Sequence, residues 1–149
     1  MFGIVGALVG EIMAGDPKAV LRATLAKNEI DIGALAADEF ARQVQSAGVF
    51  EKLVPTGGES VIRLEVVQWG LIKEVGFGSE PKPICAERGK LVKADGTVAW
   101  ENYYFITAMN GETPSATFEA FIENPQRLRE AFTKAAEVVT RALVEDLRR

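Results

Sequence analysis

The most reactive side chain in this sequence is a single thiol, Cys85, within an apolar run that predicts a strand. A cysteine nucleophile needs a neighbouring base or a cationic environment that lowers its pKa. Arg88 and Lys90 follow closely in the sequence, but the chain contains no histidine to serve as the base. We therefore expect Cys85 to be a small packing residue rather than a nucleophile.

The absence of histidine excludes whole classes of mechanism. Serine–histidine–aspartate triads, cysteine–histidine pairs, histidine general bases and histidine metal sites all require the missing residue. With only one cysteine the chain forms no internal disulfide and no cysteine zinc site within a monomer. We therefore expect no catalytic residue, no metal and no cofactor, and we interpret the chain as a non-enzymatic protein.

Carboxylates and glycines offer two weaker candidate sites. Glu65, Glu87 and Glu101 lie on predicted strands, but paired-carboxylate catalysis needs a cleft and a defined separation, so we expect all three to face solvent. The run Gly76-Phe77-Gly78 resembles half of a phosphate-binding loop. It lacks the third glycine, the strand–turn–helix setting and the lysine that such loops require, so we expect no phosphate site there.

Five aromatic residues form the fourth candidate: Trp69, Trp100, Tyr103, Tyr104 and Phe105. They predict either core packing under the helices, which we favour, or a stacking platform. If Tyr103 and Phe105 are exposed, a surface that faces a protein or a lipid becomes the better interpretation. The net charge of -4 and the pI of about 5.0 disfavour nucleic acid as a ligand.

The hydrophobic pattern predicts two helices, a strand, a hairpin and a long final helix. The Asp95-Gly96 pair between two strand-like runs is a strong hairpin signal, and Asn124-Pro125 is typical of a helix start. This order predicts an α+β fold, with a three-stranded or slightly larger, mostly antiparallel sheet and amphipathic helices packed on one face. The predicted helices cover residues 16–27, 34–47 and 124–147, and the predicted strands cover 61–71, 84–94 and 97–107.

The first fifteen residues form an apolar segment, 1–15, ahead of a single domain over 16–149. A signal peptide would require a basic residue before the apolar stretch, and this chain has none there. The stretch is also too short for a membrane span. We expect an amphiphilic helix packed on the domain or on a partner. Gly3, Gly6 and Gly10 have the spacing of small residues that permit close helix approach, which makes them a candidate contact surface.

Three runs carry a family resemblance: RLEVVQWGLI, ERGKLVKADGTVAWENYYF and ENPQRLREAFTKAAEVVTRALVEDL. Together, over residues 34–147, the chain resembles small domains of bacterial cell-envelope lipoproteins. The arrangement is similar to the α/β domains of the curli-secretion lipoprotein and of the TolB N-terminal region. The motifs are structural: Asp95-Gly96 makes a turn, Trp100 packs and Asn124-Pro125 caps a helix. No catalytic residue comes with the resemblance.

The resemblance implies a binding or assembly module of the cell envelope. Its location would be periplasmic, with a possible outer-membrane anchor, and its partner an envelope protein or a second copy of the chain. Membrane contact would come only through a lipid anchor or the N-terminal segment. A lipoprotein carries its lipid on a cysteine at the end of the signal peptide, and none precedes Cys85, so this interpretation requires a truncated chain. The alternative is a cytoplasmic small-molecule-binding protein or a histidine-free enzyme.

Overall fold

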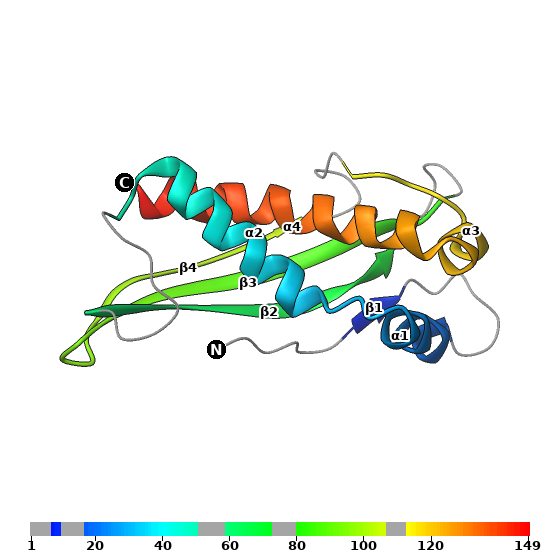
Figure 1. Ribbon diagram of the computed structural model, residues 1–149, viewed down its shortest axis with the longest axis horizontal. Helices are drawn as coiled ribbons and strands as arrows, with labels where there is room; N and C mark the ends of the chain where they lie inside the picture. Colours follow the sequence, from blue (N-terminus) through cyan, green and yellow to red (C-terminus); the bar gives the residue numbers. More distant parts are fainter. Residues whose placement is uncertain (1–6, 10–16, 51–58, 73–79, 107–112) are drawn as a thin grey trace.

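The computed structural model describes residues 7–9, 17–50, 59–72, 80–106 and 113–149, which form an α+β fold as the sequence predicts. Three long antiparallel strands pack against helices (Figure 1). In chain order the elements are β1 (Ala7–Val9), α1 (Pro17–Lys27), α2 (Ile32–Ala47), β2 (Ser60–Ile72), β3 (Lys82–Lys93), β4 (Val98–Ile106), α3 (Phe118–Glu123) and α4 (Pro125–Leu147).

The strands lie in the order β1-β2-β3-β4, with β1 parallel to β2 and the other neighbours antiparallel. The predicted Asp95-Gly96 turn joins β3 to β4. Gly96 has a φ of 87°, which glycine adopts without steric cost. The Asp95 carboxylate accepts hydrogen bonds from the amide and the hydroxyl of Thr97. This turn fixes the register of the hairpin and therefore the face on which each β4 side chain lies.

A β-bulge between Val66 and Gln68 changes the direction of the side chains along β2. Leu64 and Val66 precede it and Trp69 and Leu71 follow it, and all four are buried in the core. A bulge adds one residue to one strand and so shifts the alternation of faces. The bulge therefore keeps both halves of β2 facing the core. The end of β2 is also paired with β1, which contributes to its burial.

The helices begin and end where capping residues predict. The Asp31 carboxylate accepts a hydrogen bond from Ala34 N at the start of α2, two residues earlier than expected, and Gly48 ends the helix with a φ of 63°. Asn124 caps α4 in the same way, with a proline in the first turn. The short helix α3, which comes directly before α4, is not among the predicted helices.

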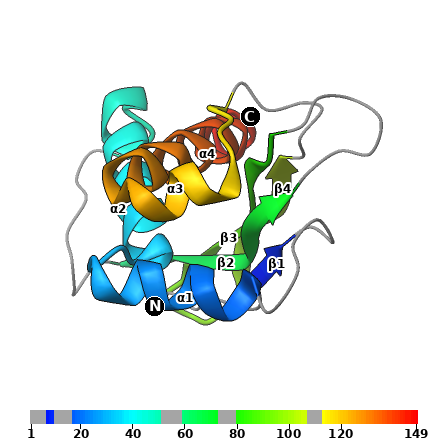
Figure 2. The ribbon, with the colours of Figure 1, turned by 90° about the vertical axis from the view of Figure 1, so that its right-hand side faces the viewer.

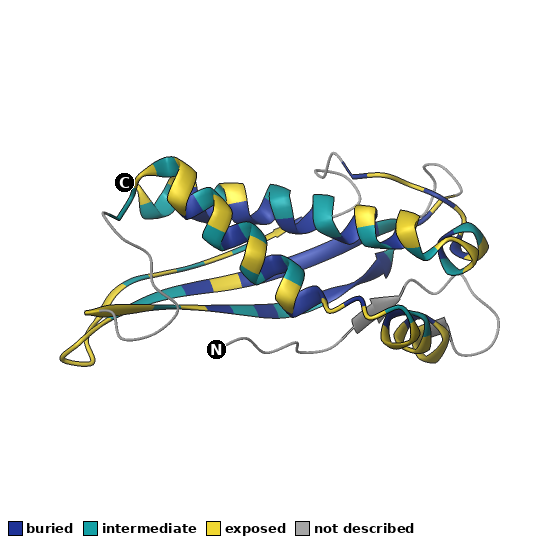
Figure 3. Ribbon diagram, viewed as in Figure 1, coloured by how far each residue is buried: buried dark blue, intermediate teal, exposed yellow. Residues whose placement is uncertain are grey.

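The helices α2 and α4 lie over one face of the long strands, whereas α1 and α3 lie at the end near β1 (Figures 1 and 2). No helix of the described part covers the opposite face of β2, β3 and β4, as the end-on view shows. The buried residues gather between the helices and the sheet (Figure 3). The largest fully buried apolar side chains are Phe121, Phe132, Leu21, Ile32, Leu64, Leu71, Leu128 and Leu143. Within the described residues the helices therefore form one layer on the sheet. We call the face without a described helix the open face, although Ile84 and Ala86 on it are buried.

The prediction of a helix in the N-terminal segment is wrong for its described part. Ala7–Val9 is a strand, parallel to β2, with Ala7 opposite Trp69 and Val9 opposite Leu71. Three consecutive apolar residues fit a short buried strand as well as a helix turn, and only the unpaired edge of β2 decides between the two. Gly3, Gly6 and Gly10 lie outside the described residues.

Candidate interaction surface

The strand β4 separates its side chains between the core and the open face of the sheet. Trp100, Tyr104 and Ile106 face the helices, and Tyr103 and Phe105 face outward, as the alternation in the sequence predicts. The register places Tyr103 opposite Arg88 of β3 and Phe105 opposite Ala86. The expectation of core packing is therefore confirmed for the inward residues and wrong for Tyr103 and Phe105.

Tyr103 and Phe105 form one aromatic pair on the open face. Their ring centroids are 5.9 Å apart with an interplanar angle of 38°, and the residues are 40% and 53% exposed. Aromatic residues supply large contact areas at low conformational cost, and adjacent exposed ones are typical of binding surfaces. We name Tyr103 and Phe105 the aromatic pair.

Two ion pairs between neighbouring strands lie on the same face. Arg88 Nη1 lies 3.5 Å from Glu65 Oε2, and Lys90 Nζ lies 3.6 Å from Glu101 Oε1. All four side chains are partly exposed, so each pair contributes little to stability because solvent screens it. These charged rows lie beside the aromatic pair. The pair is the exposed aromatic part of the surface, at its β4 edge.

The outer edge of β4 has one backbone donor that is already occupied. Asn102 Oδ1 accepts a hydrogen bond from the amide of Tyr103 at 2.8 Å. An edge strand with free amides is a template for pairing with another chain, and proteins commonly block such edges. The Asn102 side chain also donates to Asp146, and this bond together with one from Trp100 lowers the pKa of Asp146. The amide of Tyr103 is therefore not free to pair with another chain.

On the opposite face, β3 carries a buried polar cluster formed by Cys85, Glu87 and Thr140 of α4. Glu87 Oε2 accepts a hydrogen bond from Thr140 Oγ1 at 3.1 Å, and Cys85 Sγ lies 3.7 Å from Glu87 Oε1. The expectation that Glu87 faces solvent is wrong, because it lies fully buried under α4. Glu87 lies on the same face of β3 as Cys85, which is two residues earlier. This alternation was the one signal in the sequence that Glu87 faces the core. Glu65 and Glu101 do face solvent, as expected.

Burial determines the protonation of this cluster. Desolvation raises the pKa of Glu87 to about 8, since the bonds from Thr140 and Cys85 only partly compensate for the loss of water. Desolvation, followed by the nearby Glu87 carboxyl group, raises the pKa of the Cys85 thiol well above its usual value. A buried, protonated thiol is a poor nucleophile. The packing role expected for Cys85 agrees with this environment.

The remaining candidate features are a metal site, the glycine-rich run and a membrane span. In the described ranges no group of three acidic or cysteine side chains could hold a metal ion. The Gly76-Phe77-Gly78 run lies outside the described residues. No helix within the described part of the chain is long and apolar enough to cross a membrane.

The fold is similar to that of solved structures. One of them is the crystal structure of protein XCC0632 from Xanthomonas campestris, of family DUF330, with a TM-score of 0.55 and 16% sequence identity. The match covers 75% of this chain and 58% of that one, so this chain spans little more than half of the length of its structural relative. At this identity the likeness shows the fold alone. No family model matches the chain, and no curated protein matches it.

Proposed function

We propose that this domain is a non-catalytic binding module of the bacterial cell envelope that contacts a partner protein through the aromatic pair. The observation that supports the proposal most directly is the position of Tyr103 and Phe105, side by side and exposed on an edge strand. Neither residue belongs to the hydrophobic core on the other face of the sheet, so core packing does not account for them. Burial of an exposed aromatic ring against a partner is favourable.

The surroundings of the aromatic pair suit a protein partner. The charged rows of Arg88–Glu65 and Lys90–Glu101 lie beside the pair, so the surface combines an apolar patch with a charged rim, as protein interfaces do. Both signs of charge are present, so the rim favours neither nucleic acid nor an anionic membrane surface. A folded protein with mixed charges is the partner that this surface fits best.

The envelope part of the proposal rests on the resemblance of residues 34–147 to small envelope lipoprotein domains. The hairpin and the final helix that carry the resemblance are the elements that position the aromatic pair and cover the sheet. The similarity to the DUF330 protein adds a shared fold to this argument and nothing about location.

Site-directed photo-crosslinking in the native host tests the proposal. A photoreactive phenylalanine analogue replaces Phe105 in one strain and Val20, an equally exposed residue of α1, in a control strain. We expect an adduct with one envelope protein at position 105, none at position 20, and loss of the adduct when Tyr103→Ser is added. Adducts of equal yield at both positions, or an adduct only with a second copy of the chain, would contradict the proposal.

A further inference from the structure

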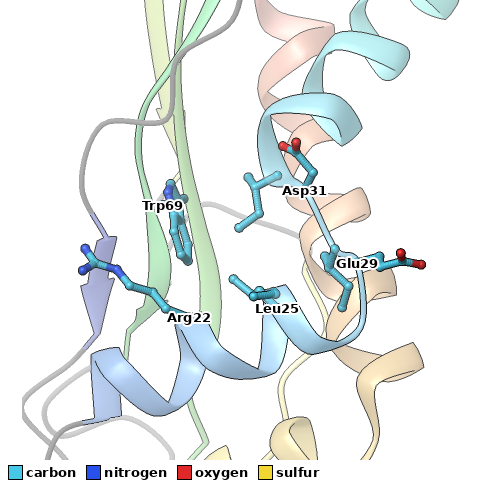
Figure 4. A pocket seen from close by; sticks show the side chains of 8 residues that line it. Arg22, Leu25, Glu29, Asp31 and Trp69 are labelled. Atoms are coloured by element: carbon cyan, nitrogen blue, oxygen red, sulfur yellow. The ribbon is translucent and has the colours of Figure 1, made fainter.

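A pocket of about 420 Å³ lies between α1, the turn that joins α1 to α2, and β2. This volume falls within the range of small-molecule sites. Three buried apolar residues form the floor: Leu25, Ile30 and Ile32. Trp69 of β2 forms one wall (Figure 4). The pocket lies on the other face of the sheet from the aromatic pair, since Trp69 belongs to the core, and it involves no residue of β4.

Trp69 brings an unused hydrogen-bond donor to this wall. Its indole Nε1 is buried and has no acceptor in the described part of the chain. The ring itself is held edge-on against Phe132 of α4, with centroids 6.1 Å apart. A buried N–H without a partner costs stability, and most buried donors in proteins are paired. An acceptor supplied from outside the chain would remove this cost.

The charges at the rim favour an anionic acceptor on the Trp69 side. Arg22 lines the pocket there, and no ion pair within the described ranges involves its guanidinium group. Figure 4 shows the carboxylate of Glu29 turned toward the opposite side. The Asp31 carboxylate is already bound to Ala34 N as the cap of α2. Arg22 therefore supplies positive charge on the Trp69 side of the pocket, and the unpaired indole N–H of Trp69 lies buried within the same wall.

The turn at the rim is held in a conformation that costs energy. Glu29 has a φ of 53°, in the left-handed region that favours glycine. Hydrogen bonds from Glu29 N to Ala26 O and from Ile30 N to Leu25 O close the end of α1. Arg129 Nη2 of α4 donates to the carbonyl oxygens of Asn28 and Glu29, at 3.1 and 3.3 Å. Strained residues fixed in this way are concentrated at ligand sites.

We propose that this pocket binds a small apolar carboxylate. Its hydrocarbon body lies on Leu25, Ile30 and Ile32, and its carboxylate accepts hydrogen bonds from Arg22 and from the indole N–H of Trp69. Charge-assisted bonds of this kind are the strong ones in a partly apolar setting. Because the indole nitrogen is shielded when the pocket is empty, a small movement of the ring or of the turn accompanies binding.

A titration with two probes of equal length and opposite charge tests the site. The variant Trp100→Phe leaves Trp69 as the only tryptophan, so its fluorescence reports on the pocket alone. We expect octanoate to change this fluorescence to saturation and octylamine to bind more weakly, by roughly tenfold. Equal responses to the two probes would show that the pocket does not select an anion, and no saturable response to octanoate at millimolar concentrations would refute the site.

Three further variants in the same background separate the roles of the residues. Arg22→Gln should weaken octanoate binding roughly three- to tenfold, as expected for the loss of one partly exposed charged contact. Glu29→Gln is the matched control at the same rim and should not weaken it. Ala26→Phe should fill the exposed mouth of the pocket and abolish binding. Unchanged octanoate affinity in either Arg22→Gln or Ala26→Phe would overturn the assignment, whatever the outcome at the aromatic pair.

Discussion

The indole ring of Trp100 on β4 lies over Gly89 on β3. A Cβ atom on residue 89 would come within 2.5 Å of Trp100 Cη2 and 2.7 Å of Cζ3, closer than such atoms approach in proteins. At its other end the ring donates from Nε1 to Asp146 Oδ2 of α4, at 2.8 Å. Glycine is therefore required at position 89 so that Trp100 can connect the hairpin to the end of the final helix.

Gly89→Ala should destabilise the domain by about 1 to 3 kcal/mol, because the ring must move off the strand and lose its packing. Urea unfolding followed by circular dichroism gives the change in free energy of unfolding. In the Trp100→Leu background the same substitution should cost much less, since the two residues are in contact. An equal cost in both backgrounds would show that the ring is not the reason for the glycine.

The buried Glu87 should make the domain less stable as the pH rises through the neutral range. Its pKa is about 8 when folded and near 4 when unfolded, so between those values the unfolded state releases a proton that the folded state keeps. The stabilisation is complete below pH 4 and is lost as the pH approaches 8, with a ceiling on the order of 5 kcal/mol. The chain has no histidine, so few other groups titrate in this window.

The measurement for Glu87 is the free energy of unfolding at a series of pH values between 5 and about 8. We expect the wild-type value to fall across this range and the value for Glu87→Gln to stay nearly constant, because glutamine keeps the hydrogen bond to Thr140 without a titrating proton. Parallel curves for the two proteins would mean that Glu87 is already ionised or hydrated in the folded state.

The sequence predicted the fold from local signals. Asp95-Gly96, Gly48 and Asn124 each fix their own neighbourhood, and the structure has a turn or a helix end at every one of them. Alternation along β4 also predicted which aromatic residues share a face. What the sequence left open was which face is covered, since that depends on where α2 and α4 lie.

Glu87, Arg22 and the Ala7–Val9 strand were missed for the same physical reason. Glu87 is buried by α4, which is more than fifty residues away in the sequence. The hydrogen bond from Thr140 partly offsets the cost of burying the carboxyl group. Arg22 lies beside Trp69 only because α1 packs next to β2. The short strand β1 exists only because the end of β2 offers a free edge. Local sequence patterns do not predict contacts between segments that are far apart in the sequence.

Asn102→Ala should increase self-association, because it exposes the amide of Tyr103 on an edge strand. Analytical ultracentrifugation over a range of concentrations should show a larger weight-average mass than for the wild type. Asp146→Ala serves as the control, because it removes the other partner of the Asn102 side chain and leaves the Tyr103 amide covered, so its mass distribution should stay close to that of the wild type. If Asn102→Ala and Asp146→Ala give the same distribution, the Asn102 side chain does not protect the edge.

The turn between α1 and α2 should respond in opposite directions to two substitutions. Glu29→Gly should raise the free energy of unfolding by about 1 kcal/mol, since glycine adopts the left-handed conformation without strain. Arg129→Gln should lower it by about 1 to 2 kcal/mol, because the turn loses its charged donor. Urea denaturation checks both values. A stabilising effect of Arg129→Gln would contradict the role assigned to that guanidinium group.

The central claim, a binding module of the cell envelope, is tested most directly by fractionation of the full-length gene product. It is expressed from its own start codon in its native host during labelling with radioactive fatty acid, with a cytoplasmic enzyme and an outer-membrane protein as markers. The account predicts that the product is recovered with the envelope and carries the label. An unlabelled product that separates with the cytoplasmic marker would contradict it.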